Sequence, residues 1–219
     1  MDNERSEAAG RPTAVEAFWA DNLKLLEDQI NTSSPRLHFL SAHGSLFSAI
    51  VWLQSQMARL LVAKRCQTKN PSISLYELWY NRDYQKQHED MLNPELDELH
   101  QSDFSHVAKE FRSSFRLSRD EDLALSCVEC LRNMLAHGNL SIFFRDPAGT
   151  GPSLVYYPRK LRGPCFKCQP SLKHEHTRRG IRVDFNPDLT KVYFQDVRTV
   201  GAAVERIASD LKLQPVDLW

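Results

Sequence analysis

The sequence predicts a mainly α-helical protein with a small β-containing part and a final helix in its last third. Apolar residues recur at three- and four-residue steps through the first two thirds of the chain, and short runs of alternating polarity follow between turn-rich loops. The length of 219 residues is sufficient for a hydrophobic core without disulfide bonds. We expect a flexible N-terminus over residues 1–13, a helical bundle over 14–140, and a basic, β-containing elaboration over 141–219 whose last helix packs back on the bundle.

Composition excludes several classes of protein. Basic and acidic residues are equal in number, 28 each, so a uniformly basic nucleic-acid binder is not expected and any such surface must be a local patch. The charged N-terminal stretch lacks the apolar region of a signal peptide, and the apolar run over 46–53 is far shorter than the roughly 20 residues of a membrane span. Five cysteines, an odd number, favour reduced thiols. We therefore expect a cytoplasmic protein without membrane contact.

Two amphipathic helices are predicted to begin the bundle. The first covers residues 15–30, and the second begins at Ser34-Pro35 and continues past residue 60. His43 replaces an apolar residue in the stripe of the second helix, so it faces the core, a dimer seam or a cleft. It is either a hydrogen-bonded core histidine or a residue that supports a site. The second stripe comprises Phe39, His43, Leu46, Ile50, Leu53, Met57 and Leu60.

Capping signals mark further helices. Ser74 and Glu77 have the spacing of a capping box, which predicts a short helix, and Ser118 and Glu121 repeat it at the start of a longer one. The longer helix is expected to end at Gly138 and, because it is apolar on more than one side, to lie centrally. A helix over 103–116 is expected between them, and it buries Phe104, Val107, Phe111 and Phe115.

The last third is predicted to contain short strands and one helix. Strand-like runs occupy residues 140–144, 154–157, 181–185 and 191–197. The last two flank a turn-like segment over 186–190 and predict a β-hairpin. A final helix is expected over 199–212.

The end of the central helix carries Arg132, Asn133 and His137. Asn133 and His137 share one face of the helix, whereas five positions turn Arg132 and His137 apart by about 140°. Histidine can transfer a proton near neutral pH, arginine offers a fork of donors to a phosphate, and asparagine can orient either group. Alternatively, Arg132 and His137 only oppose the negative end of the helix dipole.

This segment, Arg132-Asn133-x-x-x-His137 followed by Gly138, resembles the Arg-x(4 to 6)-His motif of the HEPN family, the higher eukaryotes and prokaryotes nucleotide-binding domains. The resemblance implies a HEPN-like helical bundle that contains a long antiparallel helix pair. It covers residues up to about 138 and says nothing of residues 141–219.

Many members of this family are endoribonucleases that act as homodimers and need no metal. The resemblance therefore implies attack of the RNA 2′-hydroxyl on the adjacent phosphorus, which leaves a 2′,3′-cyclic phosphate. His137 would act as general acid or base, Arg132 would hold the phosphate charge and Asn133 would orient. It further implies a toxin or anti-phage defence effector, with a neutralising antitoxin or a defence partner protein. The alternative is a catalytically silent module that binds RNA or protein.

A strongly basic segment lies in the elaboration. Between residues 159 and 182 eight basic residues face one acidic residue, which is typical either of contacts to an RNA backbone or of a solvated loop. The candidate RNA-binding residues are Arg159, Lys160, Arg162, Lys173, Arg178 and Arg179.

The same segment contains a candidate zinc site. Cys165, Cys168, His174 and His176 form a compact set of four ligands of the kind that Zn²⁺ takes. Cys127 and Cys130 form a second Cys-x-x-Cys pair but lie among apolar residues, where free cysteines behave as small hydrophobes. A structural zinc would fold the basic segment into a knuckle, and without zinc the two histidines are polar loop residues. No cofactor is expected to be required for catalysis.

Overall fold

The computed structural model describes residues 35–137, 139–143, 153–156, 175–177, 180–184 and 187–213. The described part of the chain is mainly helical, as predicted. The expected N-terminal tail and the expected helix over 15–30 lie outside the described residues.

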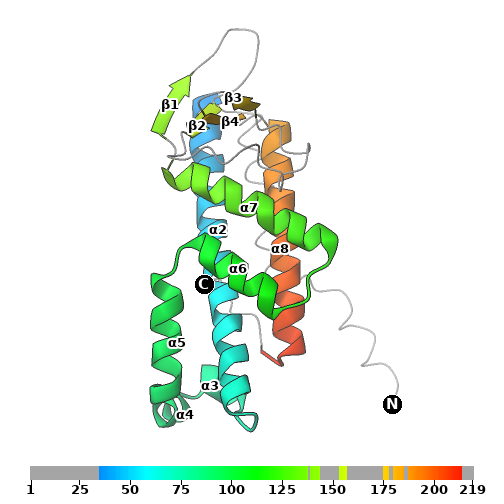
Figure 1. Cartoon of the computed structure of the whole chain (residues 1–219). Helices are drawn as coiled ribbons and strands as arrows, with labels where there is room; N and C mark the ends of the chain where they lie inside the picture. The colour runs from blue at the N-terminus through cyan, green and yellow to red at the C-terminus, as the bar shows by residue number, and fades with distance from the viewer. Residues whose placement is uncertain are drawn as a thin grey trace, which may run out of the picture.

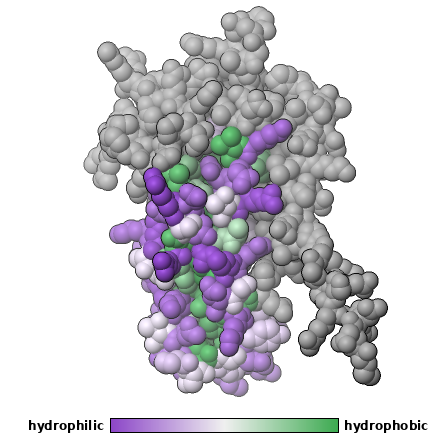
Figure 2. All heavy atoms as spheres, turned by 90° about the vertical axis from the view of Figure 1, so that its right-hand side faces the viewer, coloured by the Kyte–Doolittle hydropathy of each residue, from purple (hydrophilic) through white to green (hydrophobic). Residues whose placement is uncertain are grey.

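Two long helices, α2 and α8, run side by side, and the shorter helices cover them (Figure 1). Helices α6 and α7 lie across this pair, and α5 runs beside the C-terminal half of α2 with α3 and α4 at its end. From the side on which α8 lies, the described surface is mostly hydrophilic, with a narrow strip of hydrophobic residues (Figure 2). The helices are α2 (Pro35–Lys69), α3 (Leu75–Tyr80), α4 (Arg82–Gln87), α5 (Glu89–Gln101), α6 (Phe104–Ser114), α7 (Arg119–His137) and α8 (Pro187–Asp210).

Four short strands lie near the ends of α2 and α7 in Figure 1. They are β1 (Asn139–Phe143), β2 (Ser153–Tyr156), β3 (Glu175–Thr177) and β4 (Gly180–Asp184). Their backbones pair antiparallel in the order β1-β2-β4-β3, with Tyr156 opposite Ile181 and Thr177 opposite Gly180. Strand β1 follows α7 almost directly, so the sheet begins where the central helix ends.

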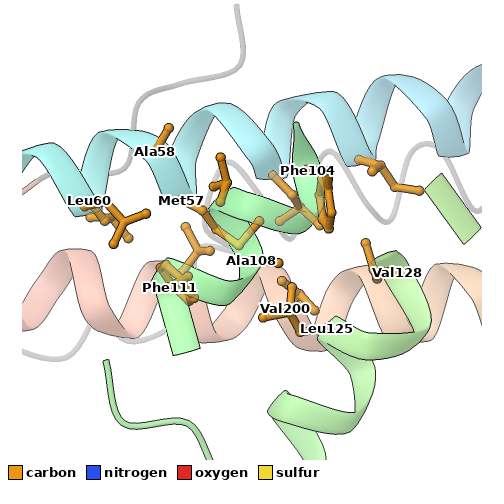
Figure 3. Packing of buried hydrophobic residues seen from close by; sticks show 14 of the residues in the cluster. Met57, Ala58, Leu60, Phe104, Ala108, Phe111, Leu125, Val128 and Val200 are labelled. Carbon is orange, nitrogen blue, oxygen red and sulfur yellow. The ribbon is translucent and has the colours of Figure 1, made fainter. Parts of the chain in front are cut away.

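The hydrophobic core surrounds α2. Figure 3 shows side chains from four helices meeting at its centre: Met57 of α2, Phe111 of α6, Val128 of α7 and Val200 of α8. Each of these four is almost completely buried. The predicted stripe of α2 is confirmed from Leu46 to Leu60, because its five members in that range, Leu46, Ile50, Leu53, Met57 and Leu60, are buried.

Among the described helices, one is long and apolar enough to cross a membrane by length and composition alone. It is α2 over Leu40–Lys69, and 61% of its most apolar stretch is buried inside the structure. The core helix of a folded domain passes the same test, so this is weak evidence for a membrane span.

The predicted capping box at Ser118 is confirmed, whereas only half of the box at Ser74 forms. The Ser74 N–H donates to the Tyr84 hydroxyl at 3.2 Å and not to the Glu77 carboxylate. The Ser74 hydroxyl accepts a hydrogen bond from the Glu77 backbone N–H at 3.2 Å. The second box is reciprocal: the Glu121 N–H donates to the Ser118 hydroxyl at 3.2 Å, and the Ser118 N–H donates to the Glu121 carboxylate at 2.6 Å. These caps fix where α3 and α7 begin, because each satisfies backbone donors that the first helical turn leaves unpaired.

The predicted hairpin over 181–197 is wrong. Only its first half is a strand, β4, whereas residues 191–197 belong to α8, which begins at Pro187 rather than near residue 199. Proline favours the first turn of a helix, where it has no hydrogen bond to lose. Tyr193, Val197 and Val200 are buried at helical spacing, so tertiary packing favours the helix over the alternating pattern.

Helices α4 and α5 were not predicted. Helix α5 contains Pro94 inside it, and a proline in the sequence argues against a continuous helix. The helix persists because Leu92 and Leu99 are buried against the core and Glu95 binds two cations of α2.

Helix α8 ends in a Schellman motif built on a lysine. The Leu213 N–H donates to the Ala208 carbonyl at 2.8 Å and the Lys212 N–H donates to the Ser209 carbonyl at 2.9 Å. Lys212 has a φ of 56°, the left-handed conformation that glycine adopts without steric cost. The motif holds because Leu213 is buried, so the chain must turn back onto the core there.

We expect Lys212→Gly to raise the free energy of unfolding by about 0.5–1 kcal/mol, because it removes the steric cost of the left-handed conformation. Chemical denaturation measures this change. Arg198→Gly, at an exposed interior position of the same helix, is the matched control and should lower stability by about 1 kcal/mol. A loss of stability in Lys212→Gly similar to that of the control would contradict the prediction.

Candidate functional site

Helix α7 carries the candidate catalytic residues, and its first turn is fastened to α8. Glu121 completes the cap of α7 and also accepts hydrogen bonds from the Arg206 guanidinium, with both carboxylate oxygens 3.0 Å away. Burial alone would raise the pKa of Glu121, but the hydrogen bonds from Ser118 and Arg206 lower it below its ordinary value. The ionised carboxylate thus ties the start of α7 to the end of α8.

A second set of contacts fastens α7 to α6. Arg112 of α6 donates to the carboxylates of Asp122 at 2.6 Å and Glu129 at 3.3 Å, and to the Ser126 hydroxyl at 2.9 Å. The acceptors are spaced by three and four residues, so they lie on one face of α7. The opposite face of the helix is apolar and buried, and it carries Ala124, Leu125, Cys127, Val128, Leu131, Met134 and Leu135.

The candidate residues lie in the last two turns of this fixed helix. Arg132 and Asn133 are half-buried, and an Arg132 guanidinium nitrogen lies 3.5 Å from the Asn133 side-chain oxygen, a long hydrogen bond. His137 is the final residue of α7, and its side chain lies outside the described part of the structure. Because α7 is continuous from Arg119 to His137, the helical spacing that the sequence analysis used for these three residues holds in the backbone.

This arrangement gives the end of α7 a defined chemical capacity. Asn133 can accept from the Arg132 guanidinium, which orients a planar fork of donors. Such a fork binds the oxygens of a phosphate or carboxylate in a bidentate manner. An imidazole on the last residue of the helix adds a group that can transfer a proton near neutral pH.

His43 lies on α2, a helix that contacts α7. Its side chain is half-buried, and its ring stacks on Phe47 with centroids 6.4 Å apart and an interplanar angle of 14°. The stacking supports the interpretation of His43 as a packed histidine at the edge of the core. The role of a supporting site residue stays a prediction.

The candidate residues of the basic elaboration fall mostly outside the described residues. Of them, His176 is placed, in the backbone of β3 opposite Ile181 of β4. No group of three or more His, Cys, Asp or Glu residues able to hold a metal occurs in the described part of the chain. The residues outside it are Arg159, Lys160, Arg162, Cys165, Cys168, Lys173, His174, Arg178 and Arg179.

The cysteines of α7 agree with the interpretation of them as apolar residues. Cys127 is 2% exposed and Cys130 is half-buried, and both are free thiols. Cys66 of α2 is also buried and free, and burial raises the pKa of its thiol, which keeps it protonated.

Sequence analysis missed a carboxyl group, Asp196 of α8. One of its oxygens is buried and has no hydrogen-bond partner in the described structure, and burial raises its pKa from the ordinary 3.8 to about 6. Asp196 shares a helix face with Tyr193 and Val200, both buried. The helical spacing of Asp196 from apolar residues is a signal that could have revealed this buried carboxyl group. The signal was missed because residues 191–197 were predicted to be a strand.

Comparison with known proteins adds nothing to this geometry: the chain matches no protein-family model, no curated protein sequence and no solved structure.

We expect Asp196→Asn to raise the free energy of unfolding at pH 8 by about 1 kcal/mol, since partial contact with solvent reduces the full cost of the buried charge. The pKa of Asp196 is raised in the folded state, so its ionisation destabilises the fold. That cost is small near pH 4, just above the ordinary pKa of 3.8, grows as the pH rises to about 6 and is nearly constant at higher pH.

Urea denaturation at pH 4 and pH 8 measures the difference, with Asp97→Asn at an exposed position of α5 as the control. An equal gain for Asp196→Asn at both pH values would show that the effect does not come from ionisation.

Proposed function

We propose that the protein is a metal-independent endoribonuclease of the HEPN type, with its site at the C-terminal end of α7. The observation that carries this proposal is the placement of Arg132 and Asn133. Both are half-buried and in contact with each other, one turn before His137, on a central helix that two neighbouring helices hold in place. This agrees with the Arg-x(4)-His motif that the sequence resembles.

The proposed reaction uses the RNA's own 2′-hydroxyl as the nucleophile. Its oxygen attacks the adjacent phosphorus, the bond to the 5′-oxygen breaks, and the products are a 2′,3′-cyclic phosphate and a 5′-hydroxyl. His137 takes the proton from the 2′-hydroxyl or gives one to the leaving oxygen. Arg132 neutralises the charge that develops on the phosphate oxygens, and Asn133 holds the guanidinium in position. DNA lacks the nucleophile and is not cut by this route.

The wider role follows from the same resemblance. We propose a homodimer that pairs two copies of the motif, and a biological role as a toxin or anti-phage defence effector with a neutralising partner protein. We also propose that residues after 140 form a small β-containing elaboration whose basic segment binds the RNA backbone. The short strands that follow α7 support this placement.

The second candidate is a silent module that holds RNA or protein without cutting it. The position of Arg132 and His137 in the final turns of α7 favours it, because cations there also stabilise the helix dipole. This function predicts RNA binding that weakens steeply with salt and with loss of Arg178 and Arg179, but no cleaved product. In the same module, zinc bound by Cys165, Cys168, His174 and His176 would stabilise the elaboration.

We expect His137→Ala and Arg132→Ala each to lower RNA cleavage at least 100-fold while the protein stays folded. The assay incubates end-labelled structured RNA with protein in excess EDTA, resolves the fragments and identifies their end groups. Wild-type protein should leave cyclic phosphates, and EDTA should not slow it.

Two matched controls separate this effect from general damage. His106→Ala replaces an exposed histidine of α6, and Arg119→Ala replaces an exposed arginine at the other end of α7. Both should cleave at the wild-type rate. If the Arg132 and His137 variants unfold instead, these residues serve to stabilise the C-terminal end of α7. If the variants fold and cleave normally, these residues do not belong to the catalytic site.

A further inference from the structure

A groove at the far end of α7 from Arg132 has no role in the proposed cleavage. Its walls come from the C-terminal ends of α2 and α8, the start of α3, and the loop between α6 and α7. Its volume is about 620 Å³, within the range of small-molecule sites. Figure 1 shows the end of α8 beside α2 at this end of the molecule.

The groove has an apolar floor and a basic margin. Phe115, Ile207 and Leu211 supply apolar surface, and Ile73 and Leu75 at the start of α3 continue it. On the side where α8 lies, Figure 2 shows hydrophobic residues in a narrow strip bordered by hydrophilic ones. The charged residues that line the groove are Lys64, Arg116, Arg206, Lys212 and Asp210.

Three of the four cations have no ion pair with the described chain. Arg206 is held by Glu121 at 3.0 Å and lies 4.0 Å from Asp210. Lys64, Arg116 and Lys212 are exposed, and within the described residues no carboxylate lies within ion-pair distance of them. Like charges that line one concave site over apolar walls raise the local positive potential, which attracts an anion.

The positions of these cations indicate which kind of anion the groove fits. They come from three separate places, namely α2, the loop after α6, and the turn that follows α8. A phosphate monoester has three terminal oxygens and a charge close to −2, so it can meet cations from several directions, whereas a carboxylate has two oxygens and one charge.

The apolar floor and one aromatic residue indicate the shape and polarity of the rest of the ligand. Tyr76 is 50% exposed, lines the groove and packs its ring against Tyr80 with centroids 4.8 Å apart. A half-exposed aromatic ring beside an apolar floor favours a flat, partly apolar body. We propose that the groove binds an organic phosphate monoester with such a body, either as a free mononucleotide or as the 5′-phosphorylated end of a strand.

This inference does not depend on the proposed nuclease activity. Isothermal titration calorimetry at constant ionic strength tests it with adenosine 5′-monophosphate, adenosine and inorganic phosphate as probes. A short oligodeoxynucleotide with or without a 5′-phosphate distinguishes the strand end from the free nucleotide, and it cannot be cut by 2′-hydroxyl attack.

We expect adenosine 5′-monophosphate to bind at least tenfold more tightly than adenosine or inorganic phosphate, because each of these lacks one half of the ligand. Lys64→Gln/Lys212→Gln should weaken that binding at least tenfold. Lys109→Gln/Arg198→Gln removes the same charge at exposed positions outside the groove and should leave the affinity unchanged.

Tighter binding of the 5′-phosphorylated oligonucleotide than of the mononucleotide would assign the strand end as the ligand. Weaker binding would assign the free mononucleotide. Equal affinity for adenosine and its phosphate, or equal loss of affinity in the two double variants, would overturn the proposal.

Discussion

Helix α2 has to be buried on most sides, and this requirement determines how the other helices pack. This helix is apolar on most of its circumference between Leu46 and Cys66, so no single neighbour can cover it. Helices α5, α6, α7 and α8 each contact a part of it. Each fully buried leucine or isoleucine of α2 contributes about 1.5–3 kcal/mol relative to its exposed state. The order and angles of the other helices follow from this requirement, and so does the place at which α7 presents its C-terminal end.

The packing around α2 also covers much of two arginine side chains, and the guanidinium group of each has different partners. Arg59 donates to the Tyr80 hydroxyl at 2.9 Å, and its guanidinium lies 5.0 Å from the centre of the Trp79 ring, so α3 is held by its aromatic residues. Arg65 donates to Glu95 at 2.7 Å. Burial would raise the pKa of Glu95, but hydrogen bonds from Lys69 and Arg65 keep it below its ordinary value. These contacts fix α3 and α5 on α2 and leave the neighbouring groove between α3 and α8.

Features that depend on residues close together in the sequence could be predicted, whereas features that depend on contacts between distant elements could not. The helix caps at Ser74 and Ser118 depend on residues three positions apart, and both form as predicted, although only the box at Ser118 is reciprocal. Helix α5 was missed because its Pro94 argues against a helix, and only the distant partners of Glu95 on α2 show why one forms. Residues 191–197 alternate like a strand, but the buried surface of α2 and α7 selects the helical face. The placement of Arg132 and Asn133 on α7 followed from helical spacing, whereas the buried carboxyl of Asp196 and the cluster of groove cations could be recognised only from the packing.

The two proposed sites lie at opposite ends of one helix. Glu121, which holds Arg206 at the edge of the groove, precedes Arg132 by eleven positions, or about 16 Å along a helix with a rise of 1.5 Å per residue. The ionic contacts of α7 with Arg112 and Arg206 involve Glu121, Asp122 and Glu129, all before Arg132. The groove is therefore connected to the start of α7 through Arg206, and the candidate catalytic residues lie beyond those contacts. Because the sites share a scaffold but no side chain, loss of charge at Lys64 and Lys212 changes the groove while Arg132 and Asn133 keep their surroundings.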